Sequence, residues 1–323
     1  MDTVGSSDGL VERMNSSFVR LIHADWSTTA VKRWAAEARR TATDWTVDAP
    51  RPVGSVEGFL KDLLREPQST LAGFDFPIGL PSVFGGRTEF GGFCQAIDAF
   101  GVGPWSRFYD VAERAQEISL HRPFYPRVAS SSVRQIHLIE ALAVQKIDAL
   151  RRQCEKATPN RPAACPLFWT LGSNQVGKAA ISGWLEIIQP ARRAGALLWP
   201  FDGMLTELSE AGRLVICETY PAEAYGHVGV RFPPGGSKRR HEDRRKATEG
   251  LDQRCEMHGI QLTSAMHDAL TAGFGPGKDG EDKFDAAIGL LGMIEVVEGR
   301  RRAAPAGTNG WEGWILGQAE ATQ

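Results

Sequence analysis

The sequence has no paired C-x-x-C cysteines, no long apolar run and no large net charge, and each absence excludes a class of protein. Its five cysteines are odd in number and widely spaced, which argues against a disulfide framework or a zinc site and indicates a reducing compartment. No apolar run approaches the length that spans a bilayer, so we expect no membrane partner. The net charge of −2 gives no overall attraction for nucleic acid, so any such site must be a local basic patch.

What is present is a globular composition, with 42% hydrophobic and 24% charged residues in a chain of 323. Residues 1–16 carry acids and lack an apolar core region, which predicts a loose tail and not a signal peptide. The polar, tryptophan-bearing residues 303–323 are predicted to form a second tail. We therefore expect a soluble, cytoplasmic protein.

The first part of the chain predicts four strands and one helix. The run "FVRLIHAD" (18–25) reads as a buried strand, and "KRWAAEARR" and "DWTVDAP" follow closely enough for an antiparallel meander of three strands. Residues 55–67 form an amphipathic pattern, with Ser55 placed to cap a helix. Residues 69–81, "STLAGFDFPIGLP", predict a fourth strand.

Residues 82–211 are crowded with aromatic residues and prolines among helical stretches, which predicts a large, mostly helical insertion. Strand character returns at 212–225, and helices are expected at 237–259, 263–273 and 281–302. The core would then comprise 17–81 and 212–302. This order predicts an α/β ribonuclease H-like fold, a mixed five-stranded sheet flanked by helices, with strands one to three antiparallel and four and five parallel. A doubly wound sheet would need longer connections between the first three strands.

Five acidic residues stand out by position. Asp25 ends the first predicted strand, Asp75 lies in the fourth, Glu218 ends the fifth, and Asp282 and Asp285 share one face of the last helix. A charge in an apolar strand is costly to bury unless it is paired or holds a metal. Such a carboxylate cluster suits phosphodiester cleavage with two divalent ions, Mg²⁺ or Mn²⁺.

Each acid also has a simpler explanation. Asp282 and Asp285 suit the first turn of a helix because the helix dipole favours acids there. Glu218 could cap a turn. Asp75 is the hardest to explain in this way, because a turn acid rarely lies within an apolar strand.

Several blocks of the chain resemble a known family. "HADWS", "GFDFPIGLP", "CETYPAEAY", "KRRHEDRRKATEGL" and "DKFDAAIGLLGMIE" are similar to the signature blocks of a family of unknown function predicted to be RNase H-like nucleases. The resemblance implies this fold and a nuclease activity, with Asp25, Asp75, Glu218 and Asp285 as the acidic site and Asp282 as a candidate fifth ligand. The chain departs from the family in lacking a glycine-rich turn after Asp25.

A second motif lies at "TLGSNQVGKAAI" (170–181), where Gly172, Gly177 and Lys178 have the spacing of a phosphate-binding P-loop. Ala179 stands where that motif needs a serine or threonine to hold magnesium. We therefore interpret the segment as a turn into a helix that packs on the core, from which Lys178 could still reach a phosphate backbone.

A dense group of cations follows in the predicted helix 237–259. Its members are Lys238, Arg239, Arg240, Arg244, Arg245 and Lys246. Interspersed acids make a solvated, salt-bridged helix one explanation. Close to a carboxylate–metal site, the same group would hold a polyanion, which makes DNA or RNA the predicted partner.

Two other functions remain open for this sequence. "DWSTT" faintly resembles the first phosphate loop of actin-like and sugar kinases, which bind ATP on the same superfold, although those proteins repeat the fold and one copy is found here. Alternatively the carboxylates are structural and the chain is a non-catalytic module.

Overall fold

The computed structural model describes residues 17–65, 69–157, 162–172, 176–305, 307 and 310–319. The strands are β1 (Arg20–Asp25), β2 (Trp34–Arg40), β3 (Trp45–Val47), β4 (Arg51–Pro52), β5 (Thr70–Phe74), β6 (Leu197–Leu198), β7 (Leu214–Glu218) and β8 (Ile260–Leu262). The predicted tail 1–16 lies outside the described residues.

The α-helices are α1 (Val56–Arg65), α2 (Ser82–Gly85), α3 (Phe93–Ala99), α4 (Ile136–Ala141), α5 (Val176–Gly183), α6 (Gln189–Arg193), α7 (Leu205–Glu210), α8 (Pro221–His227), α9 (His241–Ala247), α10 (Leu251–Met257), α11 (Ser264–Thr271) and α12 (Gly280–Val297). A π-helical turn, Trp184–Ile188, joins α5 to α6.

The strands form one mixed sheet in the order β6-β7-β5-β1-β2-β3-β8, with β4 paired to β2. The pairs β1–β2 and β2–β3 are antiparallel, whereas β5 lies parallel to both β1 and β7. The predicted α/β class and mixed sheet are confirmed. The sheet has eight strands, not the predicted five, because β4, β6 and β8 are two or three residues long and too short to leave a periodic pattern.

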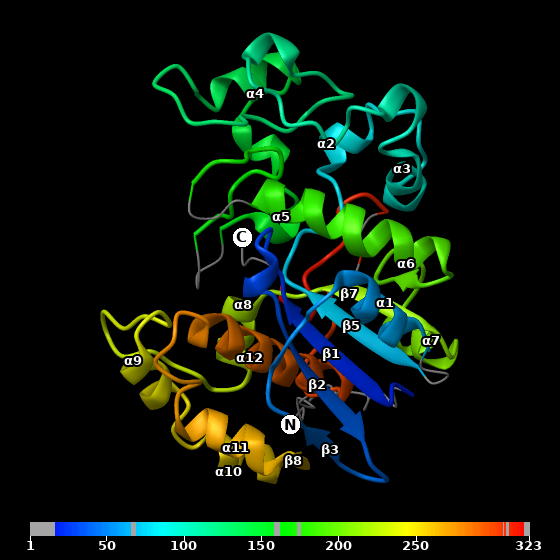
Figure 1. The fold of residues 1–323 in the computed structure, drawn as a ribbon. Coiled ribbons are helices and arrows are strands. Elements are labelled where there is room, and N and C mark those ends of the chain that lie inside the picture. The colour runs from blue at the N-terminus through cyan, green and yellow to red at the C-terminus, as the bar shows by residue number, and fades with distance from the viewer. Residues whose placement is uncertain are drawn as a thin grey trace, which may run out of the picture.

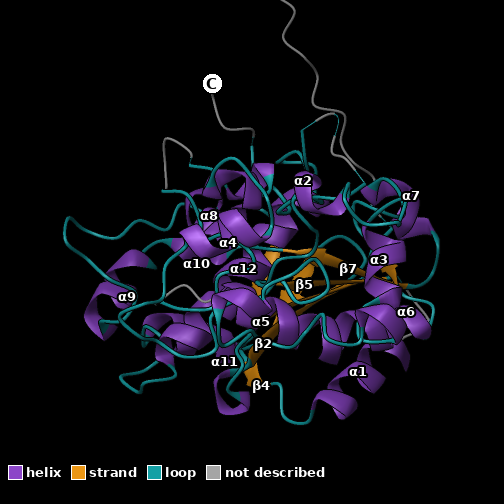
Figure 2. Ribbon diagram, turned by 90° about the horizontal axis from the view of Figure 1, so that it is seen from above, coloured by secondary structure: helices purple, strands orange, loops and turns teal. Residues whose placement is uncertain are grey.

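Helices cover both faces of the sheet (Figures 1 and 2). On one face, Leu21 and Ala38 belong to a hydrophobic cluster with α12 and α8. On the other, Ile22 and Phe74 pack with α1 and with the aromatic residues of the insertion. This alternation follows from the period of two along a strand, which sends neighbouring side chains to opposite faces.

Helix α12 lies against the sheet because small residues permit close approach. A Cβ atom at Gly289 would collide with the ring of buried His23 on β1, and one at Gly292 would meet the Cβ of Ala224 on α8 at 2.7 Å. The His23 Nδ1 lies 3.0 Å from the Ala286 carbonyl oxygen. Gly289 thus allows α12 to approach β1 closely, and Gly292 allows it to approach α8.

The insertion is less helical than predicted. The described residues 100–157 and 162–172 form loops and single turns apart from α4, and β6 adds a strand to the sheet edge. Prolines remove backbone donors and disfavour helix, which accounts for the difference. Its aromatic rings, among them Phe84, Phe124 and Phe168, supply the packing that regular structure does not.

Two further predictions at the C-terminal side were wrong. The predicted single helix 237–259 is two helices, α9 and α10, because Gly250 adopts a left-handed φ of 78° between them. Residues 310–319, predicted as a tail, pack onto the core. Ile315 is buried, and its backbone forms an isolated parallel β-bridge with Glu218 at the end of β7.

Candidate active site

Two of the predicted acids lie at the ends of adjacent parallel strands. Asp25 is the last residue of β1, and Asp75 directly follows β5, one residue beyond the strand in which it was expected. Because parallel strands end at the same edge of a sheet, the two carboxyls come close enough for the charge of Asp75 to raise the pKa of Asp25. The Trp26 backbone N–H also donates to Asp75 Oδ1, at 2.6 Å.

The last helix brings a third carboxylate to the same place. Asp285 is buried on α12, where its Oδ1 accepts a hydrogen bond from the Tyr225 hydroxyl and its Oδ2 accepts one from the Lys238 ammonium. Asp282, one turn earlier and partly buried, interacts electrostatically with Asp25. We call Asp25, Asp75 and Asp285, with Asp282 at the rim, the aspartate cluster.

The pKa values of this cluster are raised. Burial, together with the charges of Asp75 and Asp285, holds the pKa of Asp25 well above its usual range. Burial and the Asp285 charge raise the pKa of Asp75 to about 7, against the opposing hydrogen bond from Trp26. Burial raises the pKa of Asp282 to about 6. Without a bound cation, burial and mutual repulsion thus favour protonation of the Asp25–Asp75 pair.

The Asp285 carboxylate also changes the pKa values of Lys238 and Tyr225. Burial opposes the charge on Lys238, but the Asp285 carboxylate outweighs it and raises the lysine pKa. Burial and the neighbouring Asp285 also raise the pKa of Tyr225, so its hydroxyl stays a donor. Lys238 thus neutralises Asp285, and Tyr225 donates a hydrogen bond to it. The Lys238 charge also opposes the rise in the pKa values of Asp25 and Asp75.

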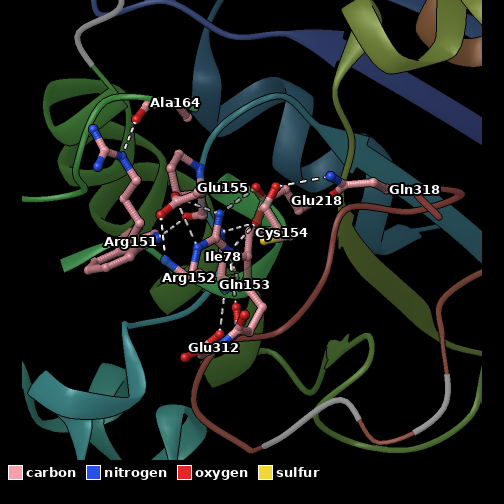
Figure 3. Close-up of polar contacts among 12 residues, drawn as sticks. Ile78, Arg151, Arg152, Gln153, Cys154, Glu155, Ala164, Glu218, Glu312 and Gln318 are labelled. Carbon is pink, nitrogen blue, oxygen red and sulfur yellow. Dashed lines mark hydrogen bonds and ion pairs between the residues drawn. The ribbon is translucent and has the colours of Figure 1, made fainter. Parts of the chain in front are cut away.

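Glu218, the fourth predicted acid, is engaged elsewhere. Both of its oxygens accept hydrogen bonds at 2.6 Å from buried Arg152 of the insertion, and Oε2 also accepts from the Ile78 backbone N–H at 2.7 Å (Figure 3). Arg152 also bonds Glu155 at 3.0 Å and the Glu312 carbonyl at 3.1 Å. These five residues, the Arg152 network, join β7, the insertion and the C-terminal segment.

The insertion also contacts the residue that follows Asp25 in the chain, Trp26. Trp26, next to Asp25, donates through Nε1 to Ser182 of α5 at 3.1 Å. The Arg33 guanidinium stacks 4.0 Å from the Trp26 ring and pairs with Glu186 of the π-helical turn at 2.6 Å. Such π-helical turns are frequent at functional sites. The insertion thus fixes the backbone whose N–H group holds Asp75.

The predicted basic group is mostly neutralised within the chain. Arg240 pairs with Asp243 at 2.5 Å, Arg245 with Glu242 at 3.1 Å, and Arg239 lies 3.8 Å from Glu281. Arg244 is buried and bonds the backbone carbonyls of Lys238, Gly273 and Gly275, so it serves the fold and is not open to a nucleic acid. Lys246 is exposed, and Lys238 enters the aspartate cluster.

The P-loop motif was expected to be a turn into a helix, and α5 begins at Val176. Residues 173–175 of the motif lie outside the described residues. The preceding described residues 162–172 form no strand of the sheet, which a P-loop would require. Lys178 lies on α5, partly buried.

Sequence reasoning missed Arg152, Tyr225 and Trp26 as partners of these acids. Trp26 and Tyr225 stand inside the blocks "HADWS" and "CETYPAEAY", so their neighbourhood in sequence was a usable signal. Arg152 lies in the irregular insertion, and no local pattern connects it to Glu218.

Carboxylate oxygens are the ligands that a hard cation such as Mg²⁺ prefers. In the part of the chain that the structure describes, no three histidine, cysteine, aspartate or glutamate side chains are arranged to hold a metal ion together. Mg²⁺, however, is commonly held by one or two carboxylates, with waters and substrate phosphates completing its shell. Asp25 and Asp75 are the residues that fit this role.

No protein-family model, curated protein or solved structure matches this chain, so the family resemblance drawn from the sequence blocks stays a prediction. None of the helices in the described residues has the length and apolar character needed to cross a membrane.

Proposed function

We propose that this protein is a divalent-cation-dependent phosphodiester hydrolase, a nuclease of the ribonuclease H-like superfold. The strand order supports the fold, because β1, β2 and β3 form an antiparallel meander, β5 lies parallel to β1, and β7 lies parallel to β5. This is the arrangement expected of that superfold from the sequence. Of the additional strands, β6 and β8 are the two outermost strands of the sheet, and β4 pairs with β2.

The observation that carries the proposal is the surplus of negative charge in the aspartate cluster. Asp25, Asp75 and Asp285 influence one another's pKa, and Lys238 is the cation that bonds within the cluster. Clustered carboxylates repel each other, so such a site is unfavourable for the fold unless a cation binds there. Mg²⁺ or Mn²⁺ would supply that charge and polarise a phosphoryl oxygen.

The reaction assigned to the site is hydrolysis of a phosphodiester. The oxygen of one water forms a bond to phosphorus, one P–O ester bond breaks, and the two protons of the water end on the phosphate product and the released hydroxyl. Asp25 and Asp75 would hold the divalent ion, which would supply positive charge to the attacking water and the leaving oxygen. A carboxyl oxygen of this pair that is not bound to the ion would orient the water and accept its proton.

The test is cleavage of labelled single- and double-stranded DNA and RNA with Mg²⁺, Mn²⁺ or EDTA, by the wild type and Asp75→Asn. We expect cleavage that needs the metal and is lost in the variant. Cleavage that persists in EDTA, or equally in Asp75→Asn, would contradict the proposal. Thermal melting with ATP and Mg²⁺ tests the kinase-like alternative, since stabilisation by nucleotide plus metal, and not by metal alone, would favour it.

A further inference from the structure

The aspartate cluster is divided into an open half and a closed half. In the closed half, both oxygens of Asp285 are occupied, one by the Tyr225 hydroxyl and one by the Lys238 ammonium. In the open half, the Trp26 N–H donates to Asp75, and Lys238 acts on Asp25 and Asp75 through its charge. An incoming divalent ion would therefore meet two available carboxylates and one that is already neutralised.

Lys238 is held in this place by its backbone. Its carbonyl accepts a 2.6 Å hydrogen bond from Nη1 of Arg244, which is almost fully buried. Arg244 in turn donates to the carbonyls of Gly273 at 2.9 Å and Gly275 at 2.6 Å, in the loop that leads into α12. The lysine and the helix that carries Asp285 are thus fixed to each other by one buried guanidinium.

The lysine side chain also remains open to solvent. Its side chain is 41% exposed, whereas that of Asp285 is 5% exposed. The lysine side chain therefore lies between solvent and buried Asp285, on the path of a substrate phosphate that approaches the cluster along it.

We propose that the site holds one divalent ion, bound by Asp25 and Asp75, and that Lys238 is a catalytic residue that supplies the second positive charge to the substrate phosphate. This rests on the proposed phosphodiester hydrolysis and departs from the two ions that the sequence suggested. In a two-ion site the ions stabilise the attacking and the leaving oxygen. Here the ammonium of Lys238 stabilises the negative charge that develops on the attacking or the leaving oxygen. The ammonium keeps its protons throughout the reaction.

The experiment is a calorimetric titration of the full chain with MnCl₂ at constant pH, for the wild type, Lys238→Met, Lys238→Arg and the control Lys61→Met. Lys61 lies on α1, with its side chain 75% exposed, and pairs with Glu57 at the surface. We expect one Mn²⁺ per chain in the wild type, Lys238→Arg and the control. Lys238→Met should bind a second ion, because the Asp285 carboxylate loses its cation. Melting curves in EDTA establish that each variant is folded.

The same variants are then assayed on bis(p-nitrophenyl) phosphate. Lys238→Met should lower kcat about 100- to 1000-fold, and Lys238→Arg should restore part of it. Two Mn²⁺ ions bound to the wild type, or unchanged stoichiometry and kcat in Lys238→Met, would overturn the role of the lysine while leaving the hydrolase proposal intact. Absence of Mn²⁺ binding in every variant, the wild type included, would instead overturn the hydrolase proposal itself.

Discussion

The aspartate cluster and the Arg152 network are two groups of acids at the ends of neighbouring strands, yet they are built on opposite principles. In the Arg152 network, each oxygen of Glu218 accepts a hydrogen bond from a guanidinium or backbone donor. Burial raises the pKa of Glu218 as it does those of Asp25 and Asp75. The Arg152 charge opposes this rise at Glu218, whereas neighbouring carboxylates add to it at Asp25 and Asp75. The position of an acid at a strand end therefore does not decide its role, whereas the partners that satisfy it do.

The difference has an energetic consequence. A buried ion pair contributes little net stability, but removal of one partner leaves an uncompensated buried charge. A cluster of like charges behaves in the reverse sense, since removal of one charge relieves repulsion. Substitutions in the two regions should thus change stability in opposite directions, and the predictions below test that contrast.

The largest effect is expected for Arg152→Met. This change leaves Glu155 and Glu218 buried without their cation and should lower the free energy of unfolding by about 3–5 kcal/mol. Urea unfolding measures it. The control Arg107→Met removes an exposed pair with Asp110 and should cost less than about 1 kcal/mol. If both substitutions lowered the free energy of unfolding by the same amount, the Arg152 network would be no more important for stability than a surface ion pair.

Glu218→Gln separates the two regions directly. The amide nitrogen would face the Arg152 guanidinium, so we expect a loss of about 1–3 kcal/mol. Because Glu218 lies in the Arg152 network, the variant should keep the Mn²⁺-induced rise in Tm. Loss of that response in a folded variant would place Glu218 among the metal ligands, as the sequence suggested.

Asp75→Asn should have the opposite sign and a smaller size. The folded carboxyl has a pKa of about 7 against an ordinary value of 3.8, so the cluster destabilises the protein progressively as pH rises from about 4 to about 7. The variant lacks this titration, and its amide oxygen can still accept from Trp26. It should match the wild type near pH 4 and exceed it by about 1–2 kcal/mol at pH 8, after allowance for partial exposure.

Urea unfolding in EDTA at several pH values measures this difference. A variant that is less stable than the wild type at every pH would make Asp75 a structural acid, satisfied by hydrogen bonds that the substitution disrupts.

The sequence was sufficient for the class of fold and for part of the candidate site. Short apolar runs and short connections predicted β1, β2 and β5 as strands of a mixed sheet, and the three-residue spacing of Asp282 and Asp285 put them on one face of α12. Strands as short as β6 and β8 carry no period, so they were not predicted. The role of Glu218 depended on Arg152, 66 positions away in the chain, and contacts over such separations leave no trace in a local pattern.

The central claim, that Asp25 and Asp75 form a cation site, is tested most directly by the Tm of the apo protein with and without MnCl₂. We compare the wild type with the double variant Asp25→Asn/Asp75→Asn. A ligand that binds only the folded state at 100 times its Kd adds about 2.7 kcal/mol to stability. The account predicts a rise in Tm for the wild type and none for the variant. No rise in the wild type, or an equal rise in both, would contradict it.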